Sequence, residues 1–355
     1  MTGTVFGSPW LQGLLSDAEI AARLGPDAQM HDMLRVEAAY ARAKAAVGQV
    51  PEEIAGDAAK AILAFTPDLN LLAATALRDG MPVPGLVAQL RAALPEALHG
   101  AVHGGLTSQD VMDTALVLAL RDVCDLLEAR LGAVITALEG LSERFGAAQM
   151  MGMTRMQPAL PITVRDRLRG WQGPLPRHLD RLTELRPRLL RLQLGGPVGT
   201  GSTLGGQRDA IAAHMAAALD LAAPDSAWHV ERDALVEFGG WLAMLTGSLG
   251  KIGQDVALMA QSGPQVLRLA SGGASSAMAH KTNPVDAEML VTLARFNAAQ
   301  LTGLTGTLLH EQERSGAAWT LEWMLLPQMM LATGAALSAA GRMVSAIESI
   351  GTTRA

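Results

Sequence analysis

The chain has 355 residues, of which 49% are hydrophobic, 17% charged and 3% aromatic, and its formal net charge is −6. The negative charge disfavours nucleic acid as a partner, because phosphate binding depends on clustered Lys and Arg. Cys124 is the single cysteine, which excludes a disulfide framework and a cysteine metal site. No uninterrupted apolar run reaches 18 residues and no signal segment opens the chain, so we expect a cytoplasmic protein without a membrane partner.

The apolar composition predicts an all-α fold. Ala, Leu and Met favour helices, whereas aromatic and β-branched strand formers are scarce. In the first hundred residues, one helix is expected over residues 33–47 and a second from Pro51, and prolines interrupt the sequence that follows. This pattern predicts a small N-terminal helical domain over residues 1–105.

Residues 106–355 predict a long-helix bundle domain. Apolar residues recur every three or four positions over 116–145 and again over 235–259, which is the spacing of one helix face. The second stretch contains five glycines, which a helix tolerates where a neighbouring helix approaches closely. Further helices are expected over residues 161–192, 284–309 and 321–350, and such lengths are typical of bundles.

A polar segment, HGAVHGGLTSQD at residues 99–110, precedes the first long helix. Thr107 or Ser108 suits the N-cap, and Asp110 suits the positive end of the helix dipole. Capping explains these residues but not His103 and the nearby glycines, which suit a backbone that approaches a ligand. We therefore favour a binding function here, at a helix N-terminus whose free N–H groups suit a carboxylate.

Three other segments each allow two interpretations. Residues 151–161, MGMTRMQPALP, form either part of a site or a proline-punctuated connection between helices. The turn GGPVGTG at residues 195–201 either cradles an anion or only reverses the chain. Residues 310–323, HEQERSGAAWTLEW, form either part of a site or a solvated charged turn.

The strip of residues 272–284, GGASSAMAHKTNP, carries the most specific chemistry. Its glycines and small residues let it fold over a small anion, and it holds paired hydroxyls, a lysine and an amide. Its final proline suits the first position of a helix. A surface linker would explain the glycines but not the polar set, so we interpret the strip as a site loop.

The order of HGGLTSQD, TRMQPALP and this strip resembles the fumarase/aspartase superfamily. Within it, TSQDVMDTA, EFGGWLAMLTGSLGKIGQDVALMAQ and HEQERSGAAWTLEWMLLPQ are similar to the bacterial 3-carboxy-cis,cis-muconate cycloisomerases. The resemblance spans about residues 30–345. It implies a homotetramer whose long helices form a central twenty-helix core, and active sites that each collect segments from three subunits. It also implies a small tricarboxylate substrate, no cofactor and no metal ion, and the superfamily's usual C-terminal domain is not expected.

The resemblance also implies roles for single residues. The proton-transfer residue is the first serine of the pair, Ser275, whose weakly basic hydroxyl needs activation by Lys281, loop N–H groups and the following helix. His103 is expected to act as an acid, a base or a carboxylate ligand. The implied substrate contacts are Thr107, Ser108, Thr154, Arg155, Gln157, Ser276, Met278, Asn283 and Arg314.

Several positions depart from the superfamily pattern. Ala279 stands where Pro is usual, and Thr282 stands where Arg is frequent. Arg155 stands where fumarate-releasing relatives have His and cycloisomerases have Trp, so a catalytic histidine is excluded there and Arg155 is free to contact a carboxylate. Glu288, which orients that histidine in relatives, is left without an assigned role.

The implied reaction is the reversible lactonisation of 3-carboxy-cis,cis-muconate to 4-carboxymuconolactone, by proton transfer next to a carboxylate through an aci-carboxylate intermediate. Its concentrated negative charge requires preorganised donors. Two alternatives remain: a β-elimination of the adenylosuccinate or argininosuccinate lyase type that releases fumarate, and a non-catalytic helical scaffold, which Ala279 and Thr282 favour.

Overall fold

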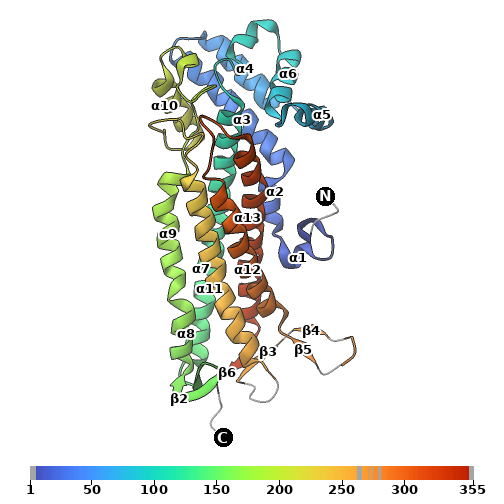
Figure 1. The fold of residues 1–355 in the computed structure, drawn as a ribbon, viewed down its shortest axis with the longest axis vertical. Coiled ribbons are helices and arrows are strands. Elements are labelled where there is room, and N and C mark those ends of the chain that lie inside the picture. The colour runs from blue at the N-terminus through green and yellow to red at the C-terminus, as the bar shows by residue number, and fades with distance from the viewer. Residues whose placement is uncertain (1–4, 262–265, 271, 275, 279–280, 352–355) are drawn as a thin grey trace.

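The computed structural model describes residues 5–261, 266–270, 272–274, 276–278 and 281–351. Thirteen α-helices dominate this part of the chain, which confirms the predicted all-α fold. The molecule is elongated: long helices lie side by side, and shorter helices gather at one end (Figure 1).

The end where the shorter helices gather, called the head here, is built from the N-terminal region and from α10. Its elements are α3 (Pro26–Ala46), α4 (Glu52–Ala64), α5 (Leu69–Asp79), α6 (Val83–Ala93), the 3₁₀ turns η2 (Glu96–Ala101) and η3 (Ser202–Leu204), and α10 (Arg208–Leu219). Three short elements precede them along the chain and lie beside the bundle: η1 (Val5–Gly7), α1 (Gln12–Leu15) and α2 (Ala18–Leu24) (Figure 1).

Six helices form the bundle. They are α7 (Ser108–Phe145), α8 (Val164–Gln172), α9 (Pro174–Leu189), α11 (Asp233–Met259), α12 (Val285–Gly306) and α13 (Gly316–Ser345). The opposite end, called the foot, carries three two-stranded antiparallel sheets: β1 (Gln149–Thr154) with β2 (Gln157–Thr163), β3 (Leu267–Leu269) with β6 (Ile347–Ile350), and β4 (Gly273–Ala274) with β5 (Thr282–Asn283).

Local chemistry explains where the helices begin. α7 begins after its N-cap residue Thr107, whose N–H donates to the Asp110 carboxylate at 2.9 Å. α13 begins at Gly316, five residues earlier than predicted, because the hydroxyl of its N-cap residue Ser315 accepts from the Ala318 N–H. Pro174 occupies the first turn of α9, a position that suits its missing N–H.

Two predicted helices need correction. Residues 161–192 do not form one helix: β2 extends to Thr163, and α8 and α9 are separated at Gly173. The last helix ends at Ser345, because residues 347–350 pair with β3 as strand β6. The segment 151–161 is a β-hairpin with its turn at Arg155 and Met156, both with positive φ.

Two clusters of buried apolar side chains form the core. The larger runs along the bundle from α7 to α13, and the smaller joins the N-terminal helices to the start of α7 and to α10. The division into domains 1–105 and 106–355 stays a prediction.

Among the described helices, α13 has the length and apolar composition of a membrane span, but 61% of its most apolar 18-residue window is buried in the fold.

Candidate active site

Asp110 holds three chain segments together at the head: the turn before α7, the glycine turn 195–201 and the segment that contains His229. Its Oδ1 accepts from the Gly195 N–H and from His229 Nε2, both at 2.8 Å. Its Oδ2 accepts from the N–H groups of Gly196 and Thr107, both at 2.9 Å. A carboxylate with four donors holds the glycine turn 195–201 against the first turn of α7.

A buried charge cluster lies one helical turn deeper. The Arg232 guanidinium donates to Asp113 Oδ2 at 2.7 Å and to Glu322 Oε1 at 2.6 Å, and Trp319 Nε1 donates to Asp113 Oδ1 at 3.0 Å. Burial alone would lower the pKa of Arg232, but the two carboxylates outweigh it and raise that pKa above its usual value. Burial raises the pKa of Glu322, which Arg232 partly opposes. The hydrogen bonds of the cluster tie α7 and α13 to Arg232, the N-cap residue of α11.

Gln109 connects this cluster to Arg314, a predicted substrate contact. Its Nε2 donates to Asp113 Oδ2 at 3.1 Å and to the His229 carbonyl at 2.9 Å, which fixes the amide. Its Oε1 therefore faces Arg314 Nε, 2.9 Å away. Arg314 Nη2 also donates to the Pro197 carbonyl at 3.1 Å, so both contacts orient the guanidinium beside the glycine turn.

His103 and His310 also lie at the head. His103 has φ of 60° in the turn before α7, and its Nδ1 is 2.6 Å from Glu37 Oε1. Both ring nitrogens of His310 are buried without a hydrogen-bond partner in the described part of the chain. Burial, followed by the nearby Arg232 charge, lowers the pKa of His310, so its neutral form is favoured.

The second group of predicted residues lies in the β1–β2 hairpin at the foot. Thr154 and Gln157 pair across the turn, and the side chains of Thr154, Arg155 and Gln157 are exposed. The same hairpin exposes Met153, Met156 and Leu160, of which Leu160 is 73% exposed. Neighbouring exposed apolar side chains are typical of interaction surfaces.

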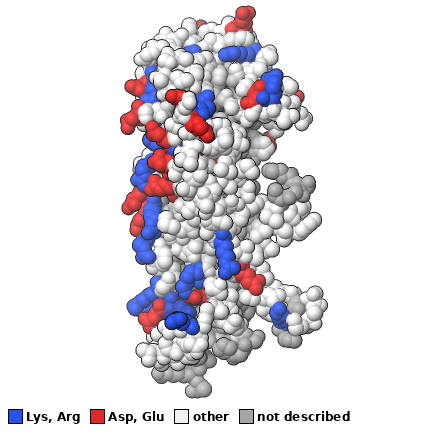
Figure 2. Space-filling model, viewed as in Figure 1, with Lys and Arg blue, Asp and Glu red and all other residues white. Residues whose placement is uncertain are grey.

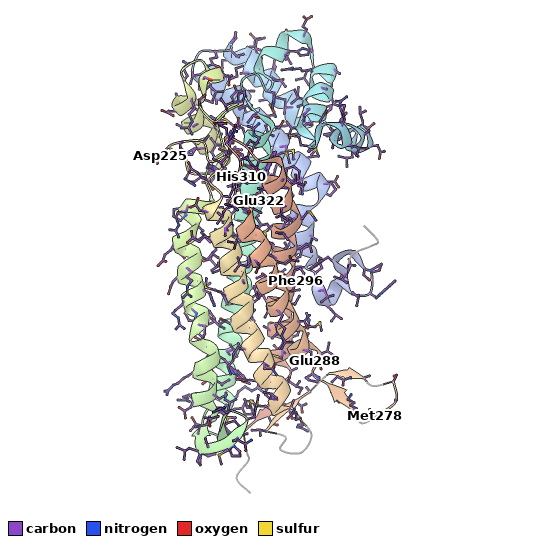
Figure 3. The ribbon with its side chains drawn as sticks, viewed as in Figure 1. Asp225, Met278, Glu288, Phe296, His310 and Glu322 are labelled. Atoms are coloured by element: carbon purple, nitrogen blue, oxygen red, sulfur yellow. The ribbon has the colours of Figure 1, made fainter. Side chains whose placement is uncertain are left out.

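The strip forms the third group. Met278 lies at the tip of the β4–β5 hairpin, which projects from the foot away from the bundle (Figure 3). Ser276, Met278 and Lys281 are exposed, Asn283 is half-buried, and the Lys281 N–H donates to the Met278 carbonyl at 3.0 Å. Ser275, the predicted proton-transfer residue, and Ala279 lie outside the described residues.

The three groups do not meet within one chain. α7 separates the head residues from the β1–β2 hairpin with 38 residues, about 57 Å at 1.5 Å per residue. α12 separates the strip from the loop of His310 and Arg314 with 22 residues, about 33 Å. Figure 3 accordingly places His310 and Glu322 near the head, and Met278 and Glu288 at the foot.

Sequence reasoning missed the residues that organise the head. Gln109, Asp113 and Glu322 each lay in a quoted motif without a role, and Glu37 had no motif at all. A signal was present, because buried acidic residues in an apolar helix face require partners. Among the described residues, no group of three or more His, Cys, Asp or Glu side chains could hold a metal ion. The predicted absence of a cofactor or metal stays a prediction.

A family model described as lyase matches residues 18–298. The chain belongs to this family, in the fumarase/aspartase superfamily, which confirms the resemblance seen in its motifs.

Several individual proteins and solved structures are also similar to the chain. The chain is 39% identical to 3-carboxy-cis,cis-muconate cycloisomerase of Pseudomonas aeruginosa over 326 residues, which are 90% of this chain and 71% of that protein. It also matches the crystal structure of the 3-carboxy-cis,cis-muconate lactonizing enzyme from Pseudomonas putida with TM-score 0.88 and 36% identity, covering 95% of this chain and 76% of that one. A fumarate lyase from Mesorhizobium sp. BNC1 gives TM-score 0.89 at 30% identity, with the same two coverages.

Proposed function

We propose that this chain catalyses the reversible cycloisomerisation of 3-carboxy-cis,cis-muconate to 4-carboxymuconolactone. The observation that carries the proposal is the 39% identity to the Pseudomonas aeruginosa cycloisomerase across 90% of the chain. The fumarate-releasing alternatives share the strip, but the fumarate lyase of similar fold is less identical to this chain, at 30%. A scaffold without chemistry would not need the polar head. We also propose that the enzyme works in the cytoplasm.

The reaction is an internal addition. A carboxylate oxygen of the muconate forms a C–O bond to one carbon of a conjugated double bond. The displaced electron pair moves into the neighbouring carboxylate as its aci form, and a proton then adds to the carbon next to that carboxylate. Every substrate atom remains in the product, so the chain has to supply one proton-transfer group and donors for the extra negative charge.

The described residues offer such donors at both ends of the molecule. At the head, the oriented Arg314 guanidinium and the first turn of α7 form a candidate carboxylate site, since cations and helix N-termini stabilise anions, and His103 is a candidate proton acceptor. At the foot, Lys281, Asn283 and Arg155 provide further donors. Ser275 is proposed as the proton-transfer residue, activated by the neighbouring Lys281 charge.

We propose that these groups meet in a homotetramer. Head and foot residues of one chain are separated by about 57 Å along α7, so a shared site requires the foot of one copy to reach the head of another. Obligate interfaces resemble a protein core and carry few charges. The middle of the bundle is largely uncharged on the face in Figure 2, whereas Lys, Arg, Asp and Glu line its edge.

The function is tested by mixing purified protein with 3-carboxy-cis,cis-muconate and following the ultraviolet absorbance of its conjugated double bonds. Adenylosuccinate and argininosuccinate are assayed in parallel. We expect absorbance loss with the muconate alone, because lactonisation removes the conjugation. Fumarate release from either succinate compound, with no change in the muconate, would contradict the proposal and favour the lyase alternative.

A further inference from the structure

We propose that Glu37 is a positioning residue for this reaction: its buried carboxylate fixes the tautomer of His103 and aims the second ring nitrogen at the substrate. The inference rests on the proposed function, in which His103 contacts the substrate. No motif of the sequence drew attention to Glu37, which lies in the middle of α3. The contact joins residues 66 positions apart in the chain.

The geometry of the pair defines the tautomer. Glu37 is fully buried, and its Oε1 lies 2.6 Å from His103 Nδ1. An ionised carboxylate only accepts hydrogen bonds, so the proton between the two atoms resides on Nδ1. Nε2 is then the acceptor nitrogen of the neutral ring. The His103 side chain is 18% exposed, and no described residue hydrogen-bonds to Nε2, which leaves that atom available to a ligand.

The surroundings of the second carboxylate oxygen of Glu37 favour a catalytic role for the Glu37–His103 pair over a purely structural one. Glu37 Oε2 is buried and has no hydrogen-bond partner among the described residues. A buried carboxylate with incomplete partners is costly, and a positively charged neighbour compensates it better than a neutral one. Proton uptake at Nε2 would turn His103 into that neighbour. The buried carboxylate of the Ser-His-Asp triad orients and stabilises its histidine in the same way.

A structural alternative is that Glu37 only anchors the turn around His103. That turn already has two anchors from the same face of α3, at positions three and seven residues further on. The Tyr40 hydroxyl donates to the Gly104 carbonyl at 2.6 Å, and Lys44 Nζ donates to the Gly100 carbonyl at 2.7 Å. Both hold the backbone, whereas Glu37 contacts the imidazole. Lys44 on α3, Arg91 on α6 and Asp110 on α7 are further charged groups that adjoin the turn.

Kinetics of Glu37→Gln, compared with Tyr40→Phe, separate the two roles. Glu37→Gln removes the charge and lets an amide N–H donate to Nδ1, so we expect a loss of roughly 10- to 100-fold in kcat with KM within about twofold. The pH–rate profile should change as well, because the partner of the imidazole is no longer an acid. In a His103→Ala background, Glu37→Gln should have no further effect.

Tyr40→Phe is the matched control, since it removes one anchor and leaves the pair intact. It should lower the thermal midpoint and leave the pH–rate profile in its wild-type place. The inference is overturned if Glu37→Gln behaves like Tyr40→Phe, losing stability without the change in kcat and pH profile. It is also overturned if His103→Ala retains full activity, or if the two substitutions lower kcat independently.

A measurement without turnover keeps the test distinct from the proposed function. In protein labelled with ¹⁵N-histidine, with the His103 signals assigned by their absence in His103→Ala, we expect the Nδ1–H tautomer in the wild type and its loss in Glu37→Gln. An Nε2–H tautomer in the wild type would overturn the inference. Failure of the wild type to convert the muconate would contradict the proposed function, while the tautomer would still decide whether Glu37 fixes the ring.

Discussion

At the scale of single residues, the proposed chemistry depends first on two side chains of the strip. Ser275→Ala should lower kcat by about 1000-fold or more while leaving the oligomer intact, because it removes the proton-transfer group. Lys281→Met should raise KM and lower kcat together, since the same charge binds the substrate and activates the hydroxyl. Steady-state kinetics and light scattering measure both effects. Near-normal activity of Ser275→Ala would refute its role.

The buried ions at the head make a second residue-scale prediction. Arg232→Met leaves Asp113 and Glu322 as buried carboxylates without a cation, which should cost about 3–5 kcal/mol in the free energy of unfolding. Arg188→Met is the matched control, because both Arg188 and its partner Glu237 are exposed and such surface pairs contribute little to stability. Urea unfolding of both variants measures the difference. Equal losses of unfolding free energy in the two variants would show that the buried cluster contributes no more to stability than the exposed pair.

His178 makes the stability depend on pH. Burial, with Arg181 and Arg177 adding to it, lowers the pKa of His178 to about 4, whereas an unfolded histidine has a pKa of about 6.5. Between these two pKa values the unfolded chain binds more protons at His178 than the folded chain does. The contribution of His178 to stability is therefore fully present above about pH 6.5 and falls as the pH drops toward about 4. At about 1.4 kcal/mol per pKa unit, the loss is on the order of 3 kcal/mol.

This dependence is measured by urea unfolding across that pH range at a fixed protein concentration, because oligomer stability varies with concentration. His178→Gln keeps a donor for Ser248, whose hydroxyl lies 2.9 Å from His178 Nε2, and removes the titration. We expect a flatter curve for the variant. Parallel curves for both proteins would assign the acid sensitivity to other groups.

At the scale of elements, α11 and α12 pack closely because glycine provides the space. A Cβ on Gly253 would lie 2.5 Å from the Ala287 carbonyl oxygen, and one on Gly250 would lie 2.6 Å from Ala294 Cβ. These positions confirm the predicted close approach, whereas nothing lies within 4 Å of a Cβ at Gly240 or Gly247 in the described part of the chain. The glycines of α11 therefore have different roles.

Gly253→Ala should lower stability by about 1–3 kcal/mol, because backbone atoms of α12 cannot move aside cheaply. Gly170→Ala on α8 is the control, since it is exposed with nothing within 4 Å and should gain up to about 1 kcal/mol of helix propensity. Thermal unfolding of both variants tests the contrast. A stabilised Gly253→Ala would contradict the close packing.

Local sequence patterns explain which helices and strands could be predicted. The periodic apolar faces of α7 and α11 are local patterns, and they located both helices. Residues 151–161 allow either a site segment or a connection between helices, and the β1–β2 hairpin is not predicted, because Pro158 and Pro161 are unusual in strands. The break at Gly173 and Pro174 is not predicted, because apolar residues continue on both sides. In each case a local signal was present but ambiguous.

At the scale of the whole molecule, the motifs predicted the residues of the candidate site but not how they are held. Asp113 and Glu322 lie in α7 and α13, and Arg232 is the N-cap residue of α11. These residues span more than two hundred positions, and no periodicity encodes such pairing. The motifs lie at opposite ends of long helices, and this arrangement bears on how the site is assembled. In the proposed homotetramer a complete site takes residues from several copies, so we expect catalysis to depend on assembly.

Hybrid oligomers test this claim most directly. His103→Ala and Lys281→Met are each expected to be poorly active, and they alter the head and the foot of the chain respectively. If each site takes its head and foot from different copies, mixing the unfolded variants in equal amounts and refolding them should restore about one quarter of the wild-type sites. Refolded hybrids that contain both variants but regain no activity would contradict the account.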